Sequence, residues 1–212
     1  MYVPKAFQET DLNKLFDVIE HNSFGLLVSD FDGAPFATHL PLLLDRTIAP
    51  YGGLIGHMAR ANPHWEKADG KTVLAVFAGP HAYISPTWYE AENVVPTWNY
   101  VAVHALGTFR AIHEQKDLLA IVSQYVDFFE AVLPHPWKFV ADSEYARKMA
   151  GAIVGFTIEI SRLEGKWKLN QNHPRERREK VIRALRAAGD DVSSAVADQM
   201  QRQLAEEAGR PS

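Results

Sequence analysis

The chain has 212 residues, of which 47% are hydrophobic and 11% aromatic, and its formal charge is −4 at pH 7. These values are typical of a globular protein with a sizeable core, and they exclude a disordered chain. The absence of cysteine excludes disulfides, thiolate nucleophiles and thiolate metal sites. The N-terminus lacks a signal-peptide pattern, and no apolar run approaches the roughly 18 residues of a membrane span, so we expect a cytoplasmic protein.

The first elements are a helix and a hairpin. Apolar residues at helical spacing, preceded by residues that can cap a helix, predict a helix over 10–22. Two apolar runs follow within 23–45 and meet at Asp32 and Gly33. This dipeptide suits the positive φ angles of a type I′ turn, so the segment predicts a β-hairpin.

The next elements are two strands with a short helix between them. Apolar and β-branched residues predict strands over 52–58 and 71–79. Between them we expect one helical turn, which Asn62 caps and in which Pro63 takes the first position, where its missing N–H costs nothing.

The remainder of the chain predicts further strands and helices. Residues 81–112 contain two strands around a turn, the second long enough to bend at Gly107. Helical periodicity predicts a helix over 114–130, and period-two alternation predicts a strand within 152–172. From about residue 174 the composition changes, and we expect two short amphipathic helices.

The order of these elements limits the fold. Six or more strands are interspersed with a few helices, without the strict alternation that a parallel doubly wound sheet requires. We therefore expect an α+β protein built on a small antiparallel barrel.

Common catalytic and metal motifs are missing from the sequence. His57 and His64 are seven residues apart and form no H-E-x-x-H motif, and the other histidines considered stand singly. Ser85 lies in "ISPTW" and not in a G-x-S-x-G elbow, and there is no glycine-rich nucleotide loop. The sequence therefore assigns no catalytic residue, and we expect no metal site.

The stretch "GHMARANPHW", residues 56–65, has the parts of a phosphate site. A strand that ends near Gly56, followed by His57, Arg60 and a helix start at Asn62, supplies basic donors and free backbone N–H groups. The alternative is that Arg60 is solvated and that Asn62 only caps the helix.

Aromatic residues occur beside polar ones in "SPTWY" and "VPTWNY". Trp88, Tyr89, Trp98 and Tyr100 offer ring faces, and their neighbours offer groups that can hydrogen-bond. Such a mixture suits either a planar polar heterocycle or a subunit interface.

Together these segments resemble one family. The blocks "MYVPKAF", "THLPLLLD", "GHMARANPHW", "YISPTWY", "VPTWNYVAVHALG" and "GKWKLNQN" occur in order over residues 1–172 and are similar to the PaiB family of FMN-binding negative transcriptional regulators. The resemblance implies a split β-barrel related to pyridoxamine oxidase-like flavoproteins. It also implies a homodimer with ligand sites between subunits.

The resemblance also implies which residues bind the cofactor, FMN. In the wider superfamily, a segment similar to "HMARANP" holds the flavin phosphate, although this chain has a shorter loop and a histidine in place of threonine. In the last block, Asn170 replaces the serine that we expect in the family. The implied cofactor-binding residues are His57, Met58, Arg60, Asn62, Ser85, Trp88, Trp98, Lys168 and Gln171.

A basic segment follows at residues 175–186. It holds six Lys or Arg against two Glu, in a chain whose net charge is −4. Such a helix either lies on the domain as a solvated face or contacts DNA or another phosphate-bearing partner.

These observations give one leading expectation and two alternatives. We expect a split-barrel domain over 1–172, a helical tail over 173–212, and an FMN-binding, homodimeric regulatory protein. The alternatives are a flavin-dependent oxidoreductase of the same superfamily and an interaction dimer that has lost its ligand. The sequence does not distinguish FMN from another phosphorylated or planar ligand, such as heme.

Overall fold

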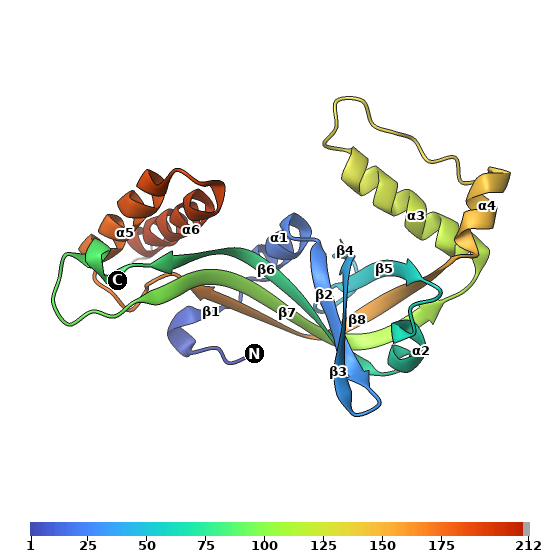
Figure 1. Cartoon of the computed structure of the whole chain (residues 1–212), viewed down its shortest axis with the longest axis horizontal. Coiled ribbons are helices and arrows are strands. Elements are labelled where there is room, and N and C mark those ends of the chain that lie inside the picture. Colours follow the sequence, from blue (N-terminus) through green and yellow to red (C-terminus); the bar gives the residue numbers. More distant parts are fainter. Residues whose placement is uncertain (210–212) are drawn as a thin grey trace. The chain divides into compact units, whose positions relative to one another are not determined.

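The computed structural model describes residues 1–209, and the first hairpin forms where the sequence predicts it (Figure 1). Strands β2 (Phe24–Phe31) and β3 (Ala34–Pro41) pair antiparallel, with Phe31 opposite Ala34. The turn residues Asp32 and Gly33 have φ angles of 54° and 86°. Both values lie in the left-handed region, where glycine and aspartate are tolerated, so the local sequence fixes this turn.

The strands form one sheet in the order β3-β2-β6-β7-β8-β5-β4, with β1 paired to β8. Strand β6 continues past the expected residue 79, and β7 and β8 have 16 residues each. The other strands are β1 (Gln8–Glu9), β4 (Leu43–Asp45), β5 (Gly53–Ala59), β6 (Thr72–Ile84), β7 (Thr97–Ile112) and β8 (Ile153–Lys168).

Helices flank this sheet, and the expected ones are present. Helix α4 and the short strand β1 were not expected from the sequence, and α2 begins one residue after Pro63. The helices are α1 (Leu12–His21), α2 (His64–Ala68), α3 (Gln115–Glu130), α4 (Glu144–Ala150), α5 (Arg175–Ala188) and α6 (Asp191–Ala208), with 3-10 turns η1 (Lys5–Phe7) and η2 (Pro86–Tyr89). No helix within residues 1–209 is both long and apolar enough to cross a membrane.

The chain divides into two compact units, and the boundary between them falls inside β6, β7 and β8. The tail helices belong to the same unit as the N-terminus and the middle of the chain. Unit 1 comprises 1–15, 78–103 and 164–212, and unit 2 comprises 16–77 and 104–163.

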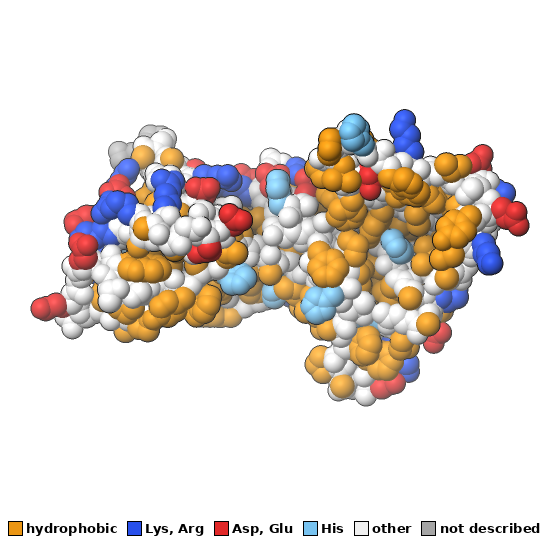
Figure 2. All heavy atoms as spheres, turned by 45° about the horizontal axis from the view of Figure 1, so that its top comes forward, with side chains coloured by type: hydrophobic (Ala, Val, Ile, Leu, Met, Phe, Trp, Pro, Cys, Tyr) orange, Lys and Arg blue, Asp and Glu red, His pale blue; other side chains and the backbone are white. Residues whose placement is uncertain are grey.

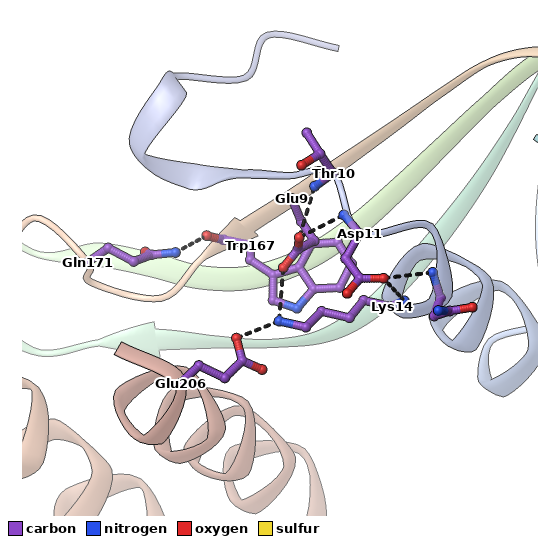
Figure 3. Close-up of polar contacts among 8 residues, drawn as sticks. Glu9, Thr10, Asp11, Lys14, Trp167, Gln171 and Glu206 are labelled. Carbon is purple, nitrogen blue, oxygen red and sulfur yellow. Dashed lines mark hydrogen bonds and ion pairs between the residues drawn. The ribbon is translucent and has the colours of Figure 1, made fainter. Parts of the chain in front are cut away.

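In unit 1, α5 and α6 cover one face of the sheet. Their buried residues include Leu185 and Met200, and the amide of the fully buried Asn99 on β7 donates to the sulfur of Met200 at 3.3 Å. At the start of α1, Lys14 lies between Glu9 and Glu206, at 3.2 and 2.5 Å (Figure 3). These ion pairs fasten the N-terminal segment to α6.

In unit 2, the core is packed closely against two glycines of the strands. A Cβ on Gly56 would lie 2.1 Å from the ring of Phe156, and a Cβ on Gly107 would lie 2.3 Å from the carbonyl oxygen of Glu159. The rings of Phe109 and Phe156 stack with centroids 4.6 Å apart. At Gly107 the close approach of β8 therefore explains the glycine directly.

Candidate functional site

The loop that follows β5 in unit 2 is organised by a buried histidine. His64 is fully buried, and its ring nitrogens lie 2.8 Å from the hydroxyl of Ser29 and 2.7 Å from that of Thr38. Asn62 donates to the same Thr38 hydroxyl, and its Oδ1 accepts from the backbone N–H of His64 at 3.0 Å. Asn62 thus bonds to the backbone N–H of the first residue of α2, although Pro63 holds the N-cap position, and the network ties the loop to the β2–β3 hairpin.

Arg60 hydrogen-bonds to the protein backbone. Its Nε donates to the carbonyl of Gly151 at 2.8 Å and its Nη2 to that of Ile153 at 2.7 Å. Its backbone N–H donates to Ala152. The guanidinium therefore fastens the end of α4 and the start of β8 to the end of β5.

His57 and Met58 point to opposite faces of β5, as neighbours on a strand do. Met58 is 5% exposed and belongs to the core. The His57 ring meets the ring of Tyr125 on α3 edge to face, with centroids 4.7 Å apart, and its Nδ1 is buried without a hydrogen-bond partner among the described residues. Burial lowers the pKa of His57 and, at Tyr125, raises the phenol pKa.

The side chains of the expected phosphate site contact three different elements. His57 contacts α3, Arg60 contacts the start of β8, and Asn62 contacts β3. Helix α2 has only five residues, too few to supply a strong helix dipole at its start. Arg60 and Asn62, two of the residues expected to bind phosphate, make hydrogen bonds that hold the loop in place.

The remaining implied residues lie in unit 1. Ser85 caps η2, where its hydroxyl accepts from the N–H of Thr87, and Trp88 follows on this turn, half-buried. Gln171 folds back on its own loop, because Oε1 accepts from Leu169 and Nε2 donates to the carbonyl of Trp167 (Figure 3). Ser85 and Gln171 therefore make local structural bonds.

Trp98 belongs to a cluster of exposed rings, which we call the aromatic face. Its ring is 54% exposed and lies 6.0 Å from that of Tyr83, which is 47% exposed, and 6.4 Å from that of His81. In β7, residues 98 and 100 alternate with the buried Asn99 and Val101. The aromatic face is therefore the side of the unit 1 sheet opposite α5 and α6.

Two lysines border the aromatic face. The ammonium of Lys168 donates to the carbonyl of Trp98 at 2.7 Å and to the hydroxyl of Thr97. Lys166 is 8% exposed and lies 5.2 Å from the centre of the Tyr100 ring. Burial, together with the charge of Lys166, lowers the pKa of Lys168.

The family resemblance implied Trp98 and Lys168 as cofactor-binding residues, and the structure brings these two together. It did not include Lys166, His81 and Tyr83, which lie on the same surface. A signal was present in "KWK", because residues two apart on a strand point to the same face. Among residues 1–209, no group of three or more His, Asp or Glu is placed to hold a metal ion.

The basic segment forms α5, and most of its cations face acids. Figure 2 shows Lys or Arg and Asp or Glu side chains interleaved over α5 and α6. Arg178 is 3% exposed and contacts both carboxylate oxygens of Glu207, at 2.6 and 3.1 Å. The other pairs are Arg175–Glu179, Lys180–Glu90, Lys180–Glu176 and Arg186–Asp198.

Comparison with known proteins gives one family and a set of structural relatives. Residues 1–162 match the family described as "Putative FMN-binding domain". The chain is similar to "Protease synthase and sporulation protein PAI 2" of Bacillus subtilis, with 34% identity over 207 residues, 96% of this chain and 98% of that protein.

Two solved structures are similar in fold, each at 14% identity and a TM-score of 0.60. One is the flavocytochrome Anf3 from Azotobacter vinelandii, matched over 78% of this chain and 72% of that one. The other is the FAD and heme binding protein from Mycobacterium smegmatis, matched over 81% and 78%. The likeness confirms the α+β split-barrel fold that the sequence predicts.

Proposed function

Because the chain belongs to the family described as "Putative FMN-binding domain", as its sequence blocks imply, we propose that it is an FMN-binding regulatory protein of the cytoplasm, similar to PAI 2. The proposal has three parts, which are flavin binding, a regulatory role and assembly as a homodimer. They are supported to different degrees by the residues described above.

The aromatic face with its lysines is the observation that carries the flavin part. A flavin mononucleotide needs a flat apolar surface for its ring and positive donors for its phosphate. The exposed ring of Trp98, which the ring of Tyr83 meets edge to face, offers the first, and the ammonium of Lys168, 2.7 Å from the Trp98 carbonyl, offers the second. These residues therefore fit the group, and FMN, when bound, would supply a redox-active ring.

Titration of the purified protein with FMN, followed by flavin fluorescence and by the visible spectrum, tests this part. We expect saturable binding that weakens on the order of 10-fold in Trp98→Ala, because a stacked ring is worth about 0.5–1.5 kcal/mol beyond the area it buries. Trp137→Ala, which removes an exposed tryptophan in unit 2, is the matched control. A protein that binds neither FMN nor FAD would contradict the proposal.

The regulatory role rests on similarity to PAI 2, and contact with DNA through α5 is its most specific form. Since four of the six cations in 175–186 face carboxylates, the charge left for phosphate contacts is small. Direct binding would give an affinity that falls steeply with salt, and Arg177→Glu with Arg183→Glu would flatten that slope. If DNA affinity changes neither with salt nor with these substitutions, direct contact through α5 is excluded, and regulation would act through another partner.

The same preparation distinguishes a regulator from an oxidoreductase. A catalytic flavoprotein would have its bound flavin reduced by NADH or NADPH within turnover times, as followed by the loss of flavin absorbance. We expect no such rapid reduction from a protein whose role is regulatory.

A further inference from the structure

We propose that Lys166 and Lys168 form the subsite that binds the anionic group of the ligand, in place of the 57–62 loop. This inference rests on the proposed function, because it takes the ligand to be a planar ring that carries a phosphate. Such a ligand requires a stacking surface beside positive charge that the protein itself does not neutralise.

The two ammonium groups belong to one surface. Lys166 and Lys168 are two residues apart on β8 and therefore point to the same face of the sheet. Lys166 lies against the ring of Tyr100, and Lys168 donates to the carbonyl of Trp98. Positive charge and exposed rings thus meet on the aromatic face of unit 1.

The contacts of these lysines carry no negative charge. The ammonium of Lys166 donates to the carbonyl of Tyr2 at 3.1 Å and lies 5.5 and 5.2 Å from the rings of Tyr2 and Tyr100. The ammonium of Lys168 donates to the carbonyl of Trp98 and to the hydroxyl of Thr97. Within residues 1–209 neither lysine forms an ion pair, in contrast to the cations of α5.

A buried cation without a counter-charge is costly, and an anion from solution would offset that cost. Lys166 is 8% exposed, so it acts through its field, while Lys168 makes the direct contact. The lowered pKa of Lys168 agrees with this arrangement, because burial and the neighbouring charge both disfavour its protonated form until an anion is present.

The 57–62 loop also carries a cation that donates to carbonyl groups, Arg60, but the loop is shaped by the hydrogen bonds of its own side chains. Arg60 already donates from two of its nitrogens to the carbonyls of Gly151 and Ile153, and Asn62 bonds to Thr38 and to the N–H of His64. A phosphate bound there would be limited to the remaining N–H groups of Arg60, those of Nη1 and the second one of Nη2.

The test is the preference of the full chain for FMN over riboflavin, which lacks the phosphate, measured as the ratio of their dissociation constants by quenching of flavin fluorescence. We expect Lys168→Gln to reduce this preference on the order of 10–100-fold and to leave riboflavin binding unchanged. Lys166→Met should reduce it as well. Lys116→Gln, at an exposed position of α3, is the matched control and should have no effect.

Arg60→Gln tests the competing assignment, in which the 57–62 loop binds the phosphate. A lost phosphate contact changes the ratio of the FMN and riboflavin dissociation constants, whereas a disturbed structure weakens the binding of both flavins alike. A preference that falls in Arg60→Gln and persists in Lys168→Gln overturns the inference, as does a wild-type protein that binds the two flavins equally. If neither flavin binds, the proposed function fails, and pyridoxal 5′-phosphate against pyridoxal tests the subsite with the same variants. If the wild-type protein then binds pyridoxal 5′-phosphate and pyridoxal equally, the inference is overturned.

Discussion

Residue 170 has a backbone conformation that most side chains avoid. Its φ angle is 62°, in the left-handed region, within the turn that joins β8 to α5. Asparagine tolerates this region better than serine, the residue that the family resemblance leads us to expect here. Its Nδ2 also donates to the hydroxyl of the buried Tyr89 at 2.8 Å, so one side chain meets a conformational and a polar requirement.

Substitutions at this position should separate the two requirements. Asn170→Gly keeps the backbone relaxed but leaves the Tyr89 hydroxyl without its partner, which should cost about 1–3 kcal/mol of unfolding free energy. Asn170→Ala loses the same bond and adds left-handed strain, about 1 kcal/mol more. Urea unfolding of both variants measures the difference. Equal stability of the two variants would show that the strain is absent.

His64 makes the stability of unit 2 depend on pH. Burial lowers its pKa from the ordinary value of 6.5, so the folded protein favours the neutral ring. As the pH falls below about 6.5, the unfolded chain takes up a proton first, and stability drops by at most about 1.4 kcal/mol per pH unit until the folded pKa is passed. His57, whose pKa is lowered in the same direction, adds to this effect.

Urea unfolding at pH 7.5, 6.0 and 5.0 tests this prediction. We expect His64→Gln to be less stable at pH 7.5 but to lose less stability on acidification, because an amide can bond to Ser29 and Thr38 without titrating. His135→Gln, in an exposed segment, is the control for the loss of a histidine. A His64→Gln curve parallel to that of the wild type would exclude His64 as the titrating group.

Among the elements, those with local signals could be predicted and those that depend on distant residues could not. The hairpin was predictable because Asp32 and Gly33 encode its turn, and β8 because its side chains alternate. The hydrogen bonds of Arg60 could not be predicted, because the carbonyl groups that accept them lie some 90 residues later in the chain. They follow α4, a helix whose sequence lacks a strong periodic signal. The burial of Lys166 could not be predicted either, because Tyr2, whose carbonyl accepts from its ammonium, comes from the other end of the chain.

The packing of α5 on α6 should depend on the pair formed by Arg178 and Glu207. Glu207→Gln leaves the buried guanidinium without a counter-charge, and because Glu207 is itself partly exposed we expect a loss of about 1–3 kcal/mol in unfolding free energy. Adding Arg178→Met removes the stranded charge and should restore part of this loss. Chemical unfolding of the single and double variants measures the coupling free energy between Arg178 and Glu207. If the effects of the two substitutions on unfolding free energy simply add, the two residues are not coupled and the prediction is wrong.

At the scale of the whole molecule, large apolar side chains gather on two surfaces within residues 1–209. One is the aromatic face of unit 1, with Tyr83 and Trp98. The other lies in unit 2, along α3, the following segment and α4, where Figure 2 shows hydrophobic side chains gathered at the surface. Its members are Phe128, Phe129, Val132, Leu133, Trp137, Val140, Tyr145 and Met149. Exposed apolar patches of this kind commonly mark interfaces.

We propose that two copies of the chain pair through the aromatic face, because aromatic residues with polar partners are enriched in interface cores. Trp98→Glu should then weaken dimerisation by about 30-fold or more, the effect of removing a hot-spot aromatic. Sedimentation velocity on the ligand-free protein at micromolar concentration should show a wild-type dimer and a monomeric Trp98→Glu variant. Trp137→Glu, which places the same charge on the unit 2 surface, should remain dimeric. The reverse result would assign the interface to 128–149, and a monomeric wild type would exclude a dimer that forms without ligand.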